Sequence, residues 1–164
     1  MGIEIERRFL LKDSSWREET CGVRHIIQIY LSYDPVVRVR TYGFSFDAID
    51  FSAVITIKGE RRPGSLGKQE IEWKIPRAEA KELLLSNLRK GAMIIKDRYH
   101  VIHEGLLWEI DEFQNQNNGL IIAEIELTQE NQEINLPPWV GEEITDDHRY
   151  ANSSLSQNPY ENWM

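Results

Sequence analysis

Eight stretches of the chain alternate between apolar and polar residues, and this period of two constrains the fold more than any other feature. Residues two apart lie on the same face of a β-strand, so such alternation is typical of strands with one buried face. Turn signals rich in Gly, Pro, Asn, Asp and Ser separate the stretches. Spacing of this kind predicts an antiparallel barrel or sandwich, and not a parallel sheet. The expected strands are 3–11, 24–31, 36–42, 53–58, 69–75, 94–101, 106–113 and 120–128.

Two segments depart from this alternation and predict helices. Residues 77–89 follow Pro76 and repeat their apolar positions at helical spacing, which predicts an amphipathic helix. After residue 139 we expect a turn that contains Gly141, and then a short helix over about residues 146–155. The polar residues 156–164 are expected to form a loosely ordered tail.

The size and charge of the chain limit its domain count and its partners. With 164 residues, 41% of them hydrophobic, we expect one domain over residues 1–155, in the α+β class with mainly β structure. Nineteen Lys and Arg residues oppose 27 Asp and Glu residues, and the net charge of −8 argues against nucleic acid or an anionic membrane as a partner. We expect a monomer or a homodimer.

The sequence also predicts a compartment. The single cysteine, Cys21, excludes an internal disulfide, and no Cys or His spacing is typical of a zinc site. Residues 1–4 lack the basic and apolar regions of a signal peptide, and no apolar run approaches the ~18 residues of a membrane helix. We therefore expect a cytoplasmic protein that does not enter a membrane.

Most of the predicted strands carry charged side chains on one face, often with the same sign two residues apart. Like charges at this spacing repel, so they need opposite charges on neighbouring strands, divalent cations or a bound polyanion. The alternative is a half-exposed sheet whose polar face is simply solvated, and spacing alone leaves both interpretations open. The like-charged pairs are Glu4 and Glu6, Glu70 and Glu72, Glu124 and Glu126, Arg38 and Arg40, and Lys96 and Arg98.

If these faces point into a closed barrel, they line a central cavity with balanced charge. Two divalent cations would bring such a cavity to about +4, which suits a triphosphate with roughly four to five negative charges. Carboxylates bind hard cations, whereas guanidinium and ammonium groups bind phosphate oxygens. The acidic residues are Glu4, Glu6, Glu70, Glu72, Glu109, Asp111, Glu124 and Glu126, and the basic residues are Arg8, Arg38, Arg40, Lys58, Lys74, Lys96, Arg98 and Arg149.

The charged motifs occur in an order that resembles a known family. Residues 4–8 (EIERR) resemble the ExExK signature of the CYTH superfamily, the triphosphate tunnel metalloenzymes, with Arg8 in place of the signature lysine. Residues 137–152 are similar to the short bacterial members that hydrolyse inorganic triphosphate, and the resemblance covers about residues 2–155. The motifs between them are Arg38-x-Arg40, Ile57-Lys58, Gln69-Glu70-x-Glu72, Lys96-x-Arg98-Tyr99, Glu109-x-Asp111 and Glu124-x-Glu126.

The resemblance implies an eight-stranded antiparallel closed barrel, with a charged tunnel inside and helices packed outside. It implies that Mg²⁺ or Mn²⁺ is bound by Glu4, Glu6, Glu124 and Glu126. It implies that phosphate groups are bound by Arg8, Arg38, Arg40, Lys58, Lys96, Arg98 and Arg149. The acidic lining would be completed by Glu70, Glu72, Glu109 and Asp111.

We therefore expect a metal-dependent triphosphatase that hydrolyses inorganic tripolyphosphate to pyrophosphate and phosphate. Lys96 is the candidate catalytic residue, as a group that orients the attacking water or accepts its proton. One alternative is an adenylate cyclase or a thiamine or nucleoside triphosphatase of the same superfamily. The other is a non-catalytic polyphosphate-binding module, which would not need the metal-binding carboxylates.

Overall fold

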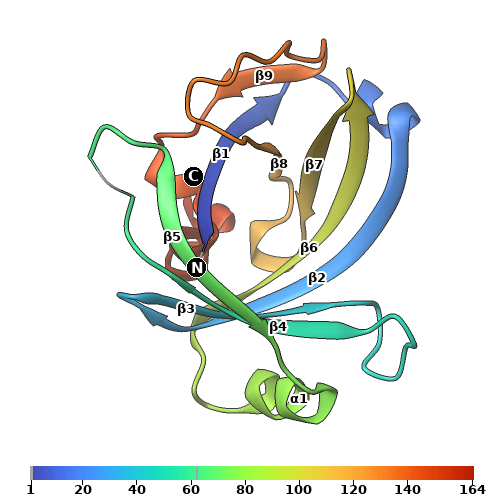
Figure 1. The fold of residues 1–164 in the computed structure, drawn as a ribbon. Coiled ribbons are helices and arrows are strands. Elements are labelled where there is room, and N and C mark those ends of the chain that lie inside the picture. The colour runs from blue at the N-terminus through green and yellow to red at the C-terminus, as the bar shows by residue number, and fades with distance from the viewer. Residues whose placement is uncertain (1, 62) are drawn as a thin grey trace.

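The computed structural model describes residues 2–61 and 63–164, and the strands within them wind into a barrel (Figure 1). All the strand pairs are antiparallel. Each of the eight predicted strands is present, and β2 and β6 extend beyond their predicted ends. The strands are β1 Gly2–Leu11, β2 Thr20–Tyr33, β3 Val36–Tyr42, β4 Ser52–Lys58, β5 Gly67–Lys74, β6 Lys90–His103, β7 Leu106–Phe113, β8 Ile121–Glu126 and β9 Val140–Glu143.

Short helices connect and follow the strands. The α-helices are α1 Arg77–Leu85 and α2 Asn152–Gln157, and the 3-10 helices are η1 Ser15–Glu19, η2 Asn115–Asn117, η3 His148–Tyr150 and η4 Tyr160–Asn162. None of the described helices is both long and apolar enough to cross a membrane.

Strand β1 closes the barrel because it pairs with three other strands. Its first part, Gly2–Ile5, pairs with β5, and its middle pairs with β8, where Glu6 lies opposite Glu126. Its last residues pair with β9. The rest of the ring runs β5-β4-β3-β2-β6-β7-β8, so every strand of the ring has two neighbours (Figure 1). The predicted eight-stranded closed antiparallel barrel is confirmed.

Strand β9 replaces the predicted turn around Gly141, so that prediction is wrong. Its segment lies along the end of β1, where the amide of Ile144 donates to the carbonyl oxygen of Arg8 at 2.8 Å. A Cβ atom at Gly141 would lie 3.0 Å from the carbonyl oxygen of Leu10. The glycine is therefore explained by the close approach of two backbones, and not by a turn.

The outer wall of the barrel carries two apolar clusters. The larger surrounds Trp108 on β7, whose ring lies 5.6 Å from those of Phe9 and Trp139. The smaller lies over β2 and β3 and is covered by α1, which packs on the outside as predicted. Helix α1 ends at Leu85, four residues earlier than predicted, and the hydroxyl of Ser86 then donates to a carbonyl oxygen of its last turn.

The C-terminal residues fold back into one end of the barrel. The predicted helix over residues 146–155 is divided into η3 and α2, and α2 contacts β6 and β2. Leu155 of α2 packs in a third cluster with Tyr30 on the inner face. The prediction of a loosely ordered tail is wrong, because Ser156 is buried and the rings of Tyr160 and Trp163 pack 5.1 Å apart on this cluster.

Candidate active site

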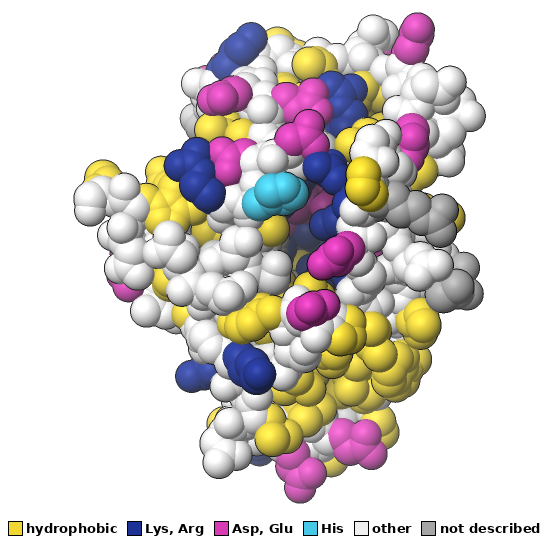
Figure 2. All heavy atoms as spheres, turned by 90° about the vertical axis from the view of Figure 1, so that its left-hand side faces the viewer, with side chains coloured by type: hydrophobic (Ala, Val, Ile, Leu, Met, Phe, Trp, Pro, Cys, Tyr) yellow, Lys and Arg dark blue, Asp and Glu magenta, His cyan; other side chains and the backbone are white. Residues whose placement is uncertain are grey.

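The alternation of β1 through β8 points its charged faces into the barrel. An inner cavity of about 280 Å³ is lined by residues from all eight strands of the ring and from the start of α2. It joins an outer cavity of about 920 Å³ that shares Glu4, Glu6 and Arg8 with it. Figure 2 shows the hollow near the middle of one face, with acidic and basic side chains inside it. The interior is therefore polar and charged, and the apolar clusters around Trp108 and under α1 lie on the outside of the barrel.

The deepest part of the site is a buried cluster of Lys96, Arg98 and Asp111. The Lys96 ammonium nitrogen lies 2.6 Å from Asp111 Oδ2, and Arg98 binds both oxygens of the same carboxylate at 2.7 and 2.8 Å. Burial lowers the pKa of Lys96 to about 8, because Arg98 and Arg40 add to the desolvation and Asp111 only partly opposes it. Burial alone would raise the pKa of Asp111, but the two cations outweigh it and hold that pKa well below its usual range.

Strand β3 supplies two buried arginines. Arg38 donates from Nη2 to the hydroxyl of Thr56 at 3.2 Å, and its Nε has no hydrogen-bond partner among the described residues. Arg40 donates from Nε to the side-chain oxygen of Gln28 at 2.9 Å. Burial lowers the pKa of Arg38, and the charge of Arg40 adds to this shift. A buried guanidinium with an unused donor is suited to an anion such as phosphate.

The acidic side of the site lies where β1 meets β5 and β8. Glu4 accepts a hydrogen bond from the Lys58 ammonium at 2.7 Å, so the pKa of Glu4 falls to about 2 although burial opposes this. Glu6 behaves differently: burial raises its pKa to about 7, and the charges of Glu124 and Glu4 add to the shift. Glu126 also has a raised pKa, from burial and then from the charge of Glu4.

These carboxylates have the chemistry of a site for a hard divalent cation. Burial raises the pKa of Glu6, and repulsion by Glu124 and Glu4 raises it further, so a bound cation would relieve this repulsion. Glu70 adds a buried carboxylate oxygen, Oε2, with no hydrogen-bond partner among the described residues, and burial and then Glu4 raise its pKa to about 7. The donor set therefore fits a hard divalent cation, although no three His, Cys, Asp or Glu side chains within residues 2–61 and 63–164 converge at ligand spacing.

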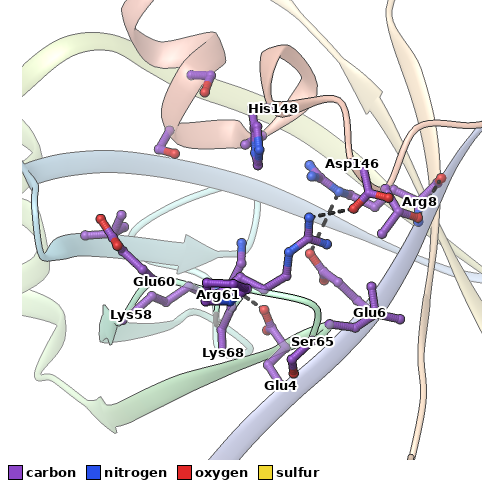
Figure 3. Close-up of a pocket in the computed structure, with 18 of the residues that line it drawn as sticks. Glu4, Glu6, Arg8, Lys58, Glu60, Arg61, Ser65, Lys68, Asp146 and His148 are labelled. Carbon is purple, nitrogen blue, oxygen red and sulfur yellow. Dashed lines mark hydrogen bonds and ion pairs between the residues drawn. The ribbon is translucent and has the colours of Figure 1, made fainter. Parts of the chain in front are cut away.

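The outer cavity lies under the connection between β4 and β5 (Figure 3). Arg61 in this connection reaches across the mouth to Asp146, with 2.5 Å between Nη2 and Oδ1. Lys68 and His148 also line the cavity. Burial lowers the pKa of Lys68, and the charges of Lys58 and Arg8 add to the shift. The outer cavity is therefore lined by the basic residues Arg61 and Lys68 in addition to Arg8 and Lys58, which also line the inner cavity.

The structure brings most of the predicted site residues together. Two exceptions are Lys74 and Arg149, which are not among the described residues that line either cavity. Lys74 is exposed at the end of β5, beyond the pairing with β1, and Arg149 is exposed and ion-paired with Asp147 at 2.7 Å. Asp111 does not line the inner cavity itself, but it forms ion pairs with Lys96 and Arg98, which do. The residues at the inner cavity wall are Glu4, Glu6, Arg8, Arg38, Arg40, Lys58, Glu70, Glu72, Lys96, Arg98, Glu109, Glu124 and Glu126.

Sequence reasoning missed several side chains of the site. Lys68 could have been found, because it lies two residues before Glu70 on the same face of β5. Gln28 and Asn152 are uncharged, so the pattern of charged pairs does not indicate them. Arg61 lies in a connection where no period indicates which residues point inward.

Comparisons with known proteins agree with this geometry. The sequence matches the CYTH domain over residues 2–158. It is 38% identical over 164 residues to a protein of Acetivibrio thermocellus named inorganic triphosphatase, with 99% of each chain covered. It is 31% identical over 159 residues to a protein of Nitrosomonas europaea with the same name, covering 93% of this chain and 96% of the relative.

Solved structures show the same fold. The crystal structure of an inorganic triphosphatase superposes with a TM-score of 0.63, at 30% identity and with 95% of each chain covered. A protein from Pyrococcus horikoshii superposes with a TM-score of 0.56 at 18% identity, over 78% of this chain and 80% of that one, and shows the fold alone. The family match spans nearly the whole barrel and includes its charged lining, so the chain belongs to the CYTH domain family.

Proposed function

We propose that this protein hydrolyses inorganic tripolyphosphate to pyrophosphate and phosphate, with Mg²⁺ or Mn²⁺ as its cofactor. The observation that carries the proposal is the division of one enclosed channel into a carboxylate corner and a guanidinium–ammonium wall. The protein that contains this channel is 38% identical to a relative named inorganic triphosphatase, which supports the proposal. A non-catalytic polyphosphate-binding module would need the basic wall and not the carboxylates.

The division of charge matches the needs of phosphoryl transfer. This reaction needs little covalent help from the protein, because positioning and neutralisation of charge supply most of the catalysis. In the proposal, Glu4 and Glu6 hold the divalent cation together with Glu124 and Glu126. When bound, the cation would neutralise phosphate oxygens and favour ionisation of water.

The basic residues would bind and orient the substrate. Arg38 and Arg40 would bind phosphate oxygens from β3, and Arg98, fixed by Asp111, would bind them from β6, which only β2 separates from β3. Arg8 and Lys58 complete this group nearer the mouth. Arg8 replaces the lysine of the family signature, and its forked guanidinium can bind two oxygens of one phosphate.

Lys96 is our candidate for the residue beside the attacking water. It has no exposed surface, and its pKa of about 8 gives it a neutral fraction near neutral pH that an exposed lysine lacks. The water oxygen would attack the terminal phosphorus, its proton would pass to Lys96 Nζ, and pyrophosphate would leave with the bond electrons. The basic wall would stabilise the charge that the leaving group gains.

The test is a phosphate-release assay with tripolyphosphate, ATP, thiamine triphosphate and pyrophosphate in parallel, with Mg²⁺ or Mn²⁺. We expect tripolyphosphate to be cleaved fastest to equimolar phosphate and pyrophosphate, and EDTA to abolish the reaction. The size of the outer cavity favours one second candidate, a triphosphatase or cyclase for substrates with an organic group. Equal cleavage of ATP, or formation of cyclic AMP, would support that candidate. Binding without turnover would support a polyphosphate-binding module.

A further inference from the structure

A buried and a half-buried amide side chain lie between the cations of the proposed site. Gln28 is on β2 and has no exposed surface, and Asn152 is the first residue of α2. Gln28 Nε2 donates to Asn152 Oδ1 at 3.0 Å and also lies 3.1 Å from the hydroxyl of Tyr30. The two amides therefore join the barrel wall to the C-terminal helix inside the channel.

Each amide also holds one cation. Gln28 Oε1 accepts from Arg40 Nε at 2.9 Å, and Asn152 Oδ1 accepts from Lys96 Nζ at 2.9 Å. Arginine and a protonated lysine can only donate, so with Lys96 charged the orientation of both amides is fixed by their partners. The result is a continuous chain of hydrogen bonds from Arg40 through Gln28 and Asn152 to Lys96.

The hydrogen bonds explain an amide at each position. Gln28 accepts from Arg40 and donates to Asn152, which a carboxamide can do without a net charge, and Asn152 Oδ1 accepts from both Gln28 and Lys96. A carboxylate at either position would add negative charge where a polyanion is to bind. An apolar residue would leave a buried guanidinium or ammonium short of one acceptor.

We propose that Gln28 and Asn152 are positioning residues that fix Lys96 relative to Arg40, so that α2 completes the site. This inference rests on the proposed function and extends it from the charged lining to two neutral residues. Lys96 keeps its contact with Asp111 when Asn152 is removed, so its charge stays in place. What is lost is the direction of its ammonium group, and misplacement of a reacting group lowers the rate more than it weakens binding.

The test compares Asn152→Ala, Gln28→Ala and the double variant with a control, Gln157→Ala, which changes an exposed glutamine in the same helix. We expect kcat for tripolyphosphate to fall about tenfold or more in each single variant, with KM within about threefold of the wild type. Because both residues act through one chain of hydrogen bonds, the double variant should be little slower than either single variant. The control should match the wild type. Unchanged kcat in both single variants, or effects that multiply in the double variant, would overturn the proposal.

A second measurement is independent of turnover. The Lys96 ammonium is followed by NMR in lysine-labelled, metal-free protein, with its signal identified by its absence from Lys96→Arg. Its pKa of about 8 should fall in Asn152→Ala, because the lost acceptor favoured the charged form. It should rise in Asn152→Asp, which keeps the acceptor and adds a charge, whereas general loosening of the fold would not move it in opposite directions.

Calorimetry of tripolyphosphate binding in EDTA should give Kd values within about threefold of each other for the wild type and Asn152→Ala. A wild type that binds but does not turn over tripolyphosphate would refute the proposed function, and the NMR titration would still test the hydrogen bond. Equal Lys96 titration in all three proteins would refute the positioning role whatever the substrate.

Discussion

Glu6 offers the sharpest test of how the acidic corner is built. Burial raises its pKa from 4.5 to about 7, and the charges of Glu124 and Glu4 add to the shift. A carboxyl with a raised pKa in the folded state binds its proton more tightly there than in the unfolded chain. Its contribution to stability is therefore complete below about pH 4.5 and is lost as the pH rises toward 7.

The size of this effect follows from the shift. About 2.5 pKa units at ~1.4 kcal/mol each give roughly 3 kcal/mol of lost stability in the metal-free protein at pH 8. In Glu6→Gln, the neutral amide avoids this loss. We expect metal-free Glu6→Gln to be more stable than the wild type at pH 8 by up to about 3 kcal/mol, or roughly 6–12 °C in Tm, and nearly equal to it at pH 4.5.

The assay is urea and thermal unfolding in EDTA at pH 4.5, 6 and 8, repeated with excess Mg²⁺ or Mn²⁺. The exposed Glu133 supplies the control variant, Glu133→Gln, which should follow the wild type at each pH. Divalent cations should stabilise the wild type and stabilise Glu6→Gln much less, because the amide carries no charge. If Glu6→Gln is destabilised at pH 8 in EDTA, then the carboxylate corner is not short of positive charge, and the argument for a cation there is refuted.

Three further predictions follow from other contacts. Arg61→Ala should raise KM for tripolyphosphate about three- to tenfold in steady-state kinetics, with kcat nearly unchanged. Asp146→Ala should lower KM, because it frees Arg61 from its ion pair at the mouth. Equal KM values in both variants and the wild type would show that Arg61 does not contact the substrate. In calorimetry, Arg38→Ala should weaken metal-free tripolyphosphate binding about tenfold or more and leave the Mn²⁺ affinity within about twofold of the wild type. A larger loss of Mn²⁺ affinity than of tripolyphosphate affinity would contradict the role of Arg38 in binding phosphate. Trp139→Ala should destabilise the fold by about 3–5 kcal/mol in urea unfolding, because it empties the space beside Trp108, and a loss below 1 kcal/mol would contradict that packing.

The charged lining was predictable because the period of a strand is short and strict. The rule that puts Glu4 and Glu6 on one face of β1 also puts Arg38 with Arg40 and Glu124 with Glu126. Closure of the barrel does not follow from this pattern, which also fits a half-exposed sheet with a solvated face; the family resemblance implied it. The family resemblance supplied the order of the motifs, and the fold agrees with it.

The parts that sequence reasoning missed depend on contacts between distant segments. Nothing local to residues 140–143 distinguishes a turn from a strand, and only the neighbouring backbone of β1 explains Gly141. The tail is polar in composition, yet Tyr160 and Trp163 find an apolar cluster at the end of the barrel. Arg149 was assigned to phosphate from its motif, but its neighbour Asp147 binds it at the surface.

The multiple pairing of β1 has a consequence for how the protein is made. Glu6 lies beside Glu126, and the end of the same strand pairs with β9, so β1 is synthesised well before two of its three partner strands. Contacts of such long sequence separation form slowly, because the intervening chain must be ordered first. A product that ends before β8 therefore lacks Glu124, Glu126 and Asn152 of the inner cavity, and its β1 has no β8 to pair with.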